Sequence, residues 1–305
     1  MPVEIIFLGT AGAVPTENRN LIATLLRRNR DLFLFDVGED IQRQFVKAKI
    51  SFNKPLKIFI THFHGDHING LPGLLFRFSI SERSEPLEIY GPKGILSFIK
   101  CLDEITGLHN TFPIKVYEFR GNTTLIDTQE YVIRSFIVEH NTEAYGYIFQ
   151  EKPLPGRFYP ERAKKLGIPM GPLWKKLQMG SSITLDDGRI ITPDMVLGPP
   201  RKGLKIVISG DTKYSEQVIK AAQNADVLIH ESMYLDDMMD EAALRGHSTA
   251  KDAARVAKAA NVKLLILTHF SSRYTEVKKF EDEARSIFDS TIAAYDLLRI
   301  MLKNE

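Results

Sequence analysis

The segment after the apolar run 57–60 carries three histidines and one aspartate within six positions, His-Phe-His-Gly-Asp-His at residues 62–67. Imidazole and carboxylate groups together suit a borderline divalent cation such as zinc. Side chains of extended backbone alternate with period two, so His62 and His64 would point to one side and chelate one ion. Gly65 permits a sharp turn that directs Asp66 and His67 toward a second ion. We therefore predict a metal centre; a histidine-rich surface loop and a single structural ion are the alternatives.

Further candidate ligands follow strands or loops later in the chain. His140 and His269 come after apolar runs, and so does Asp211, although an aspartate in Gly-Asp-Thr is often a turn residue or a helix cap. Each is weak as a single motif residue, but together they make up a ligand set. We expect one ion to be held by His62, His64 and His140, the second by Asp66, His67 and His269, and both to be bridged by Asp211.

The elements that must position these residues alternate between strands and helices in both halves of the chain. In the first half, strands are expected at 3–10, 21–26, 32–35, 57–60 and 87–90, and helices at 40–49, 71–78 and 93–105. In the second half, strands are expected at 114–119, 130–138, 144–149, 182–185, 189–192, 204–209, 227–229 and 263–267, and helices at 249–260, capped by Ser248, and at 278–303. The candidate ligands follow strand C-termini, where α/β folds gather their sites. We predict an α/β four-layer αββα sandwich that forms a single domain over residues 1–305.

Composition agrees with a globular protein: the chain has 305 residues, of which 44% are hydrophobic and 26% charged. No apolar stretch approaches the roughly 20 residues of a membrane span, and the N-terminus lacks a signal-like segment, so we expect no membrane contact and a cytoplasmic location. The single cysteine, Cys101, excludes a disulfide within the chain, and its apolar surroundings indicate a packing residue.

Basic charge is concentrated between residues 152 and 180. This segment has seven Lys and Arg residues against one acid, Glu161, a balance of +6, whereas the whole chain carries only +2. Prolines stand at positions 153, 155, 160, 169 and 172. A solvated face is the simpler interpretation, but a basic insertion punctuated by proline and glycine favours a protruding arm over 152–180.

The ligand pattern resembles that of the metallo-β-lactamase superfamily. Its His-x-His-x-Asp-His signature is present intact at residues 62–67, and its later ligands match His140, Asp211 and His269. The resemblance covers almost the full chain and implies the αββα metallo-β-lactamase fold and a two-metal hydrolase. It implies two Zn²⁺ ions per subunit, with Mn²⁺ as a possibility and no organic cofactor.

Narrower features resemble the ribonuclease Z family, the tRNA 3′-processing endonucleases. Residues 15–20, Pro-Thr-Glu-Asn-Arg-Asn, are similar to that family's Pro-x-Lys-x-Arg-Asn loop, with Glu17 in place of the usual Lys. Residues 246–249, Gly-His-Ser-Thr, resemble its catalytic loop, residues 268–274 its last ligand motif, and Gly171-Pro172 the arm that grips tRNA. The resemblance implies removal of the 3′ trailer from precursor tRNA by a homodimer. The Glu17 replacement leaves open how the enzyme treats a precursor that already carries a CCA end.

Roles follow from the reaction that the resemblance implies. Two cations would lower the pKa of a bridging water and clamp the phosphoryl oxygens, and Asp66 would also take the nucleophile's proton. The ribose 3′ oxygen needs a proton, for which His247 is the best candidate, and Glu231 would orient its imidazole unless it merely ends a strand. Attack by water would leave a 3′-hydroxyl on the tRNA and a 5′-phosphate on the trailer. We expect His230 to be a core histidine and His109 to be solvated. Substrate contacts are expected from Arg19, Asn20, Lys164, Lys165, Gly171, Pro172, Lys175, Lys176, Ser271 and Arg273.

Two other functions remain open from the sequence. The same two-metal site could hydrolyse a small substrate, such as a cyclic nucleotide, a lactone or a thioester, although the basic arm disfavours this. A non-catalytic RNA-binding protein with a structural metal is the other alternative. The sequence does not determine the native metal, the cleavage position or the host lineage.

Overall fold

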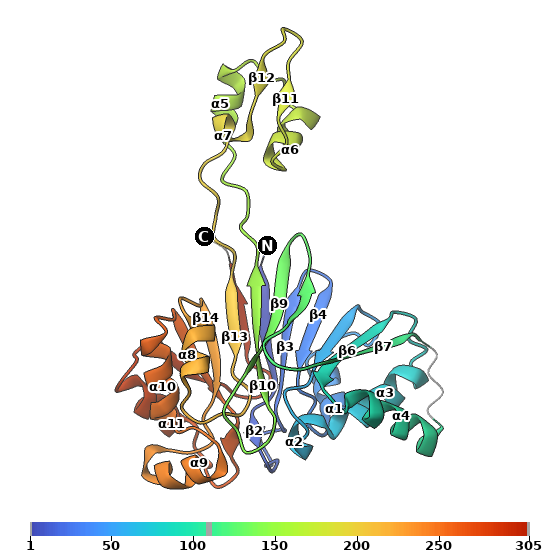
Figure 1. Ribbon diagram of the computed structural model, residues 1–305, viewed down its shortest axis with the longest axis vertical. Coiled ribbons are helices and arrows are strands. Elements are labelled where there is room, and N and C mark those ends of the chain that lie inside the picture. The colour runs from blue at the N-terminus through green and yellow to red at the C-terminus, as the bar shows by residue number, and fades with distance from the viewer. Residues whose placement is uncertain (1, 108–111, 304–305) are drawn as a thin grey trace.

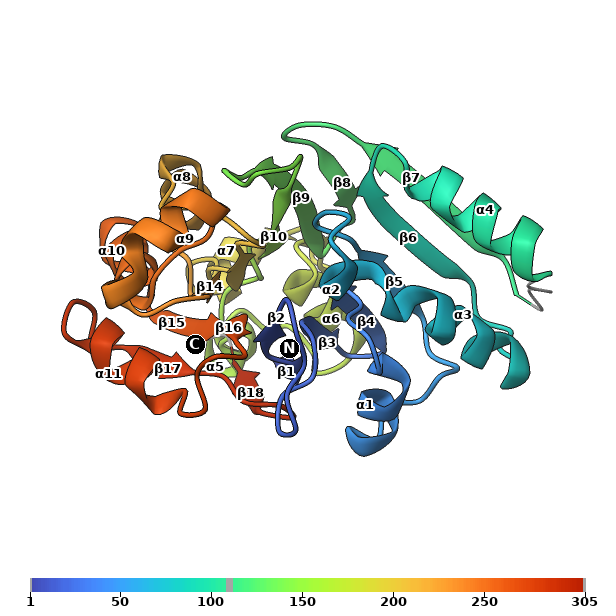
Figure 2. The ribbon, with the colours of Figure 1, turned by 90° about the horizontal axis from the view of Figure 1, so that it is seen from below.

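Two seven-stranded sheets form the centre of the computed structural model, which describes residues 2–107 and 112–303 (Figures 1 and 2). The first sheet has the order β18 (Arg299–Leu302), β1 (Val3–Gly9), β3 (Ala23–Arg28), β4 (Asp31–Phe35), β5 (Leu56–Phe59), β6 (Leu87–Pro92) and β7 (Ile114–Phe119). The second has the order β17 (Thr291–Ala293), β15 (Leu264–Thr268), β14 (Val227–Glu231), β13 (Lys205–Ile208), β10 (Tyr145–Glu151), β9 (Tyr131–Ile137) and β8 (Thr124–Asp127). The strands from β4 to β7 are parallel, and so are β13, β14, β15 and β17. Parallel strands bring their C-terminal ends to one edge, where side chains can converge.

Both faces of the first sheet are buried at β1, which explains why this strand is almost wholly apolar. Ile5 and Phe7 pack between the two sheets, whereas Ile6 and Leu8 belong to the core beneath the helices. The outer face of this sheet is covered by α1 (Ile41–Lys47), α3 (Gly70–Ile80) and α4 (Ile95–Thr106). The outer face of the second sheet is covered by α8 (Glu216–Ala222), α10 (Ala250–Ala259) and α11 (Lys278–Arg285). These layers confirm the predicted αββα sandwich.

The segment 278–303 differs from the single helix that its sequence predicts. Only α11 is helical, and the chain then forms β17 in the second sheet and β18 in the first. β18 runs antiparallel to β1, with Val3 opposite Leu302. Ile292 and Ile300 pack against the core between the sheets. The helix prediction is wrong after Arg285 because strand formation here depends on partners that are remote in sequence.

Two local predictions also need correction. Thr249, and not Ser248, caps α10: its side chain accepts from the N–H of Asp252, whose carboxylate accepts from the N–H of Thr249 in return. Ser248 Oγ instead donates to the Thr212 carbonyl at 2.6 Å. Cys101 is exposed on α4, so it is not a packing residue.

Within residues 2–107 and 112–303, no helix is long and apolar enough to cross a membrane.

A long extension leaves the sandwich between β10 and β13 (Figure 1). Two runs of chain rise together, bridged at Leu154–Arg201 and at Phe158–Leu197. They end in a small unit made of α5 (Pro160–Lys165), α6 (Pro172–Gln178), β11 (Ile183–Thr184), β12 (Ile190–Ile191) and α7 (Pro193–Val196). Strands predicted at 182–185 and 189–192 therefore form, but in this unit and not in the body. They belong here because Ile183 and Ile191 share a core with Leu177 of α6.

Candidate metal centre and active site

Strand ends from both sheets converge on one group of polar side chains. His62 follows β5, Asp211 follows β13, and His269 follows β15, while Glu231 is the last residue of β14. Left-handed backbone at Gly210 (φ 64°) and at His269 (φ 60°) turns the chain sharply as the strands end. Asp66 and His67 lie on the short helix α2 (Gly65–Ile68), and His140 lies in the loop between β9 and β10. The fold thus gathers all seven ligands that the sequence predicts.

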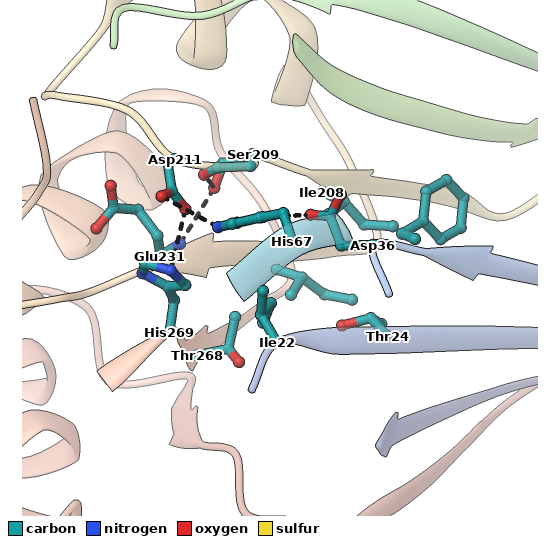
Figure 3. A pocket seen from close by; sticks show the side chains of 13 residues that line it. Ile22, Thr24, Asp36, His67, Ile208, Ser209, Asp211, Glu231, Thr268 and His269 are labelled. Atoms are coloured by element: carbon teal, nitrogen blue, oxygen red, sulfur yellow. Dashed lines mark hydrogen bonds and ion pairs between the residues drawn. The ribbon is translucent and has the colours of Figure 1, made fainter. Parts of the chain in front are cut away.

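These side chains form two groups that share Asp211. Ligand atoms of His62, His64, His140 and Asp211 lie within 4.8 Å of one another, and so do those of Asp66, His67 and His269. Asp211 Oδ2 is 3.7 Å from His62 Nε2. Figure 3 shows Asp211 beside His67 and His269: its Oδ2 is 3.3 Å from His67 Nε2, and its Oδ1 is 3.4 Å from His269 Nε2. Asp211 therefore lies between the two groups, as a bridging ligand must.

The buried imidazoles are presented as ligands. Among the described residues, the buried His62 Nε2 and His67 Nε2 have no hydrogen-bond partner and face the Asp211 carboxylate, while the other nitrogen of each ring is occupied. His62 Nδ1 lies 2.9 Å from Thr61 Oγ1, and His67 Nδ1 lies 2.8 Å from Asp36 Oδ2. His140 Nδ1 is held by the Gly246 carbonyl at 2.7 Å. A metal-binding histidine commonly has one nitrogen fixed in this way and the other directed at the ion, so the residues fit a divalent cation.

Charge in the cluster also favours a cation. Burial alone would raise the pKa of Asp211, but His269 and His67 hold it well below its usual range. Burial also opposes ionisation of Asp66, whose hydrogen bond with His269 nevertheless lowers its pKa. Burial lowers the pKa of His67, yet Asp211 and Asp36 outweigh it and raise that pKa well above the usual value. The carboxylates are thus ionised, and the site stabilises positive charge at its centre.

His247 and Glu231 form a hydrogen-bonded pair beside the ligands. His247 Nδ1 lies 2.9 Å from Glu231 Oε1, which also accepts from the Thr212 N–H at 2.8 Å. Glu231 Oε2 accepts from the Met233 N–H at 3.2 Å, and the side chain is almost fully buried. These contacts fix the carboxylate on the imidazole, so Glu231 does more than end a strand. Burial lowers the pKa of His247, but Glu231 outweighs it and raises this pKa to about 9.

An open cleft gives access to this pair. It has a volume of about 300 Å³ and includes His64, His140 and His247 together with Tyr234 and Arg245 in its walls. The His140 and His247 rings are neighbours in its wall, with centroids 5.0 Å apart and planes tilted by 57°. A phosphodiester entering the cleft would therefore meet His64 and His140 of the cluster together with His247.

The loop 13–20 braces the cluster. The Ala13 N–H donates to Asp66 Oδ2 at 2.7 Å, which fixes one candidate ligand. The sequence predicts that Arg19 contacts substrate, but its guanidinium is buried and donates to the carbonyls of Ser271 at 3.2 Å and Tyr274 at 2.7 Å. Ser271 is buried as well, so both residues brace this loop, and their contact with substrate stays a prediction. Asn20 is partly exposed, and its contact with substrate stays a prediction.

The remaining predicted contacts lie in two places. Arg273 is exposed, with its guanidinium over the Tyr234 ring at 5.6 Å from the centroid, close to the cleft. The arm residues are exposed in the unit at the tip of the extension, which stands away from the two sheets (Figure 1): Lys164, Lys165, Gly171, Pro172, Lys175 and Lys176. His230 is buried, as predicted, with Nδ1 2.7 Å from the Glu231 carbonyl. His109 lies outside the described residues.

Sequence reasoning assigned no role to several supporting residues. Asp36 holds His67, and Asp296 accepts from the Asn20 N–H at 2.7 Å and from Thr10 Oγ1 at 2.8 Å. Asp36 could have been recognised in the sequence, because it is a polar residue directly after a buried strand, β4. Gly12 is needed too, since a Cβ there would lie 2.5 Å from His269 Cε1. Only the folded chain reveals such a close approach.

Comparison with known proteins places the chain in a family. Residues 194–270 match a family model described as the beta-lactamase superfamily domain, and residues 3–141 match one described as the anti-Pycsar protein Apyc1. A ribonuclease Z of Methanothermobacter thermautotrophicus is 45% identical over 301 residues, which cover 99% of this chain and 97% of that protein. A ribonuclease Z of Nitrosopumilus maritimus is 43% identical, with 99% of this chain and all of that protein covered.

Solved structures agree with this relationship. Human tRNase Z, short form, superposes with a TM-score of 0.72 at 29% identity and covers 97% of this chain and 98% of its own. The metallo-beta-lactamase fold protein YhfI from Bacillus subtilis has a TM-score of 0.71 at 18% identity, and the match covers 99% of this chain and 100% of that protein. This similarity concerns the fold alone. With two curated relatives above 40% identity over nearly the whole length, this chain belongs to the ribonuclease Z family and has the metallo-β-lactamase fold.

Proposed function

We propose that the chain removes the 3′ trailer from precursor tRNA by water attack assisted by two metal ions. As a ribonuclease Z, the chain is a tRNA 3′-processing endoribonuclease. The observation that carries the proposed mechanism is the joining of two ligand groups through Asp211 next to the His247–Glu231 pair. An electrophilic centre and a proton donor then face the same cleft.

The two ligand groups suit two Zn²⁺ ions, with Mn²⁺ as an alternative. His62, His64, His140 and Asp211 would hold one ion. Asp66, His67 and His269 would hold the other, with Asp211 shared, since its carboxylate lies 3.3 Å from His67 Nε2 and 3.4 Å from His269 Nε2. When bound, such ions supply a water nucleophile at neutral pH and neutralise charge on the phosphoryl group.

Side chains of the protein handle the protons. Asp66, held by the Ala13 N–H, is placed to accept the proton of the attacking water. His247, whose Nδ1 is fixed by Glu231, would donate a proton from Nε2 to the departing ribose 3′ oxygen. A pKa near 9 keeps this imidazole protonated at neutral pH. The products are a tRNA with a 3′-hydroxyl and a trailer with a 5′-phosphate.

The position of the arm supports action across a dimer. The extension leaves from the end of β10 and the start of β13, whereas Asp211 follows the opposite end of β13. At about 3.3 Å per residue, the run 198–208 spans at most roughly 33 Å, and Figure 1 shows the tip at the end of the extension far from the body. A tip that points away from its own cleft is suited to hold a tRNA for the cleft of a second copy, and we therefore propose a homodimer.

The direct test incubates the purified protein with end-labelled precursor tRNA, with and without a chelator, and maps the cut. We expect one cut at the 3′ end of the tRNA, a 3′-hydroxyl product, loss of cleavage with chelator and recovery with Zn²⁺. Failure to cut precursor tRNA, with retained hydrolysis of a cyclic nucleotide, lactone or thioester, would favour the small-substrate alternative. Metal-independent RNA binding without cleavage of any substrate would favour the non-catalytic one.

A further inference from the structure

A buried ion pair joins the two sheets at the root of the extension. Arg28, the last residue of β3 in the first sheet, donates from Nε to Glu151 Oε1 at 2.8 Å. Glu151 is the last residue of β10 in the second sheet, where the chain departs into the extension. The two side chains are 1% and 0% exposed. Arg28 Nη1 also donates to Glu130 Oε2 at 2.9 Å.

Glu151, where the outgoing run of the extension begins, is hydrogen-bonded to the returning run. Its N–H donates to the Leu204 carbonyl at 2.9 Å, and its Oε2 accepts from the Leu204 N–H at 3.3 Å. Gly203 packs so closely that a Cβ there would lie 2.3 Å from the Glu151 carbonyl oxygen. The outgoing and returning chains are thus fastened to each other and to Arg28 at a single point.

Beyond this point the two runs of the extension pack closely, so their orientation at the root determines the orientation of the tip. A Cβ on Gly156 would lie 1.9 Å from the Gly198 carbonyl oxygen, so the two runs pack backbone against backbone. Arg201 Nε donates to the Pro155 carbonyl at 3.2 Å. Four prolines limit backbone rotation in these runs, at positions 153, 155, 199 and 200.

A buried ion pair is a poor source of stability, because desolvation of both charges offsets their attraction and apolar residues often serve as well. What a guanidinium–carboxylate contact provides is a defined geometry. We propose that Arg28 and Glu151 are positioning residues that set the direction of the arm and hence its ability to present tRNA to a cleft. The inference rests on the proposed function, since it assigns the arm to substrate binding.

The test compares substrates of different size. In the double variant Arg28→Met with Glu151→Gln, both charges are removed and an acceptor for the Leu204 N–H is kept. We expect KM for precursor tRNA to rise about tenfold or more, with KM and kcat for bis(p-nitrophenyl) phosphate unchanged. Arg28→Lys keeps the charge, removes the planar fork and should give an intermediate rise, which provides a second variant if the first folds poorly.

A neighbouring ion pair supplies the matched control. Arg27 of β3 pairs with Glu4 of β1, so this ion pair lies within the first sheet and does not join the two sheets. The double variant Arg27→Met with Glu4→Gln should leave KM for precursor tRNA within about twofold of the parent. If KM for precursor tRNA rose equally in both double variants, the cause would be general loosening of the sheet, and the proposal would be overturned.

Arm direction can also be measured without catalysis. Spin labels at Asp186→Cys in the tip and Lys220→Cys on α8, in a Cys101→Ser background, should give one narrow distance distribution. The Arg28→Met and Glu151→Gln variant should broaden it or shift its mean. An unchanged distribution together with an unchanged KM for precursor tRNA would refute the inference. Because this readout needs no substrate, failure of the parent to cut tRNA would count against the proposed function and not against the positioning role.

Discussion

Neutralising the lysines at the tip of the extension should weaken precursor tRNA binding most at low salt and make binding less dependent on salt concentration. Lys164 and Lys165 end α5, and Lys175 and Lys176 lie in the last turn of α6. All four are exposed, and no ion pair among the described residues involves them. Their charge is therefore available for the phosphates of a nucleic acid.

The size of the effect follows from counterion release. Each phosphate neutralised contributes about 0.9 to the slope of log affinity against log salt, so four lysines with one phosphate each contribute about 3.6. Raising monovalent salt from about 50 to about 200 mM should then increase KM of the parent about 10²-fold more than KM of a variant in which all four are Gln.

The assay measures kcat/KM for precursor tRNA across this salt range, with bis(p-nitrophenyl) phosphate as a substrate that cannot reach the tip. The control variant replaces four exposed lysines of body helices by Gln and should keep the parental slope: Lys100 on α4, Lys220 on α8, Lys258 on α10 and Lys279 on α11. If the tip variant kept the parental slope, or if both variants lowered it equally, the arm would not be the electrostatic contact for tRNA.

Three further predictions concern the body. His247→Asn should lower kcat for precursor tRNA about 10²- to 10⁴-fold but kcat for bis(p-nitrophenyl) phosphate far less, because nitrophenolate leaves without a proton; equal losses would exclude a proton-donor role. Arg19→Met should lower kcat on both substrates and reduce the free energy of unfolding by about 1.5–3 kcal/mol in chemical denaturation. A loss of activity on tRNA alone would instead indicate that Arg19 contacts substrate. Burial lowers the pKa of His230, so its contribution to stability is complete above about pH 6.5 and declines as pH falls below it, by at most about 1.4 kcal/mol per pH unit. His230→Gln should therefore lose less stability than the parent between pH 6.5 and 5, and parallel melting curves in that range would contradict this.

The sequence predicts which side chains the fold gathers into the cluster because their signals are local, and their role as metal ligands stays a prediction. Alternation with period two places His62 and His64 on one side, and a strand that precedes each later ligand indicates where its side chain will lie. The layers were likewise predictable, since strands buried on two faces and helices with one apolar face leave few possible arrangements.

The contacts that support the cluster are recognised only in the folded chain. Asp36 meets His67, and Arg19 meets the carbonyl of Ser271, through contacts between segments remote in sequence. The predicted arm ends at residue 180, but the extension continues past it for a related reason: residues on both sides of position 180 form one small core. Local composition detects where charge changes, but it does not detect which side chains share a core.

The pairing of β1 with β18 has a consequence for biosynthesis. One of the first strands to leave the ribosome acquires one of its two neighbours only after the strand at 299–302 has been made. Until then the outer edge of β1 presents unpaired backbone groups, which invite association with other chains. Closure across so long a loop is slow compared with local folding, so the nascent protein passes through a state with an open sheet edge. Chaperone binding and aggregation should be greatest in that interval, before the sandwich is closed.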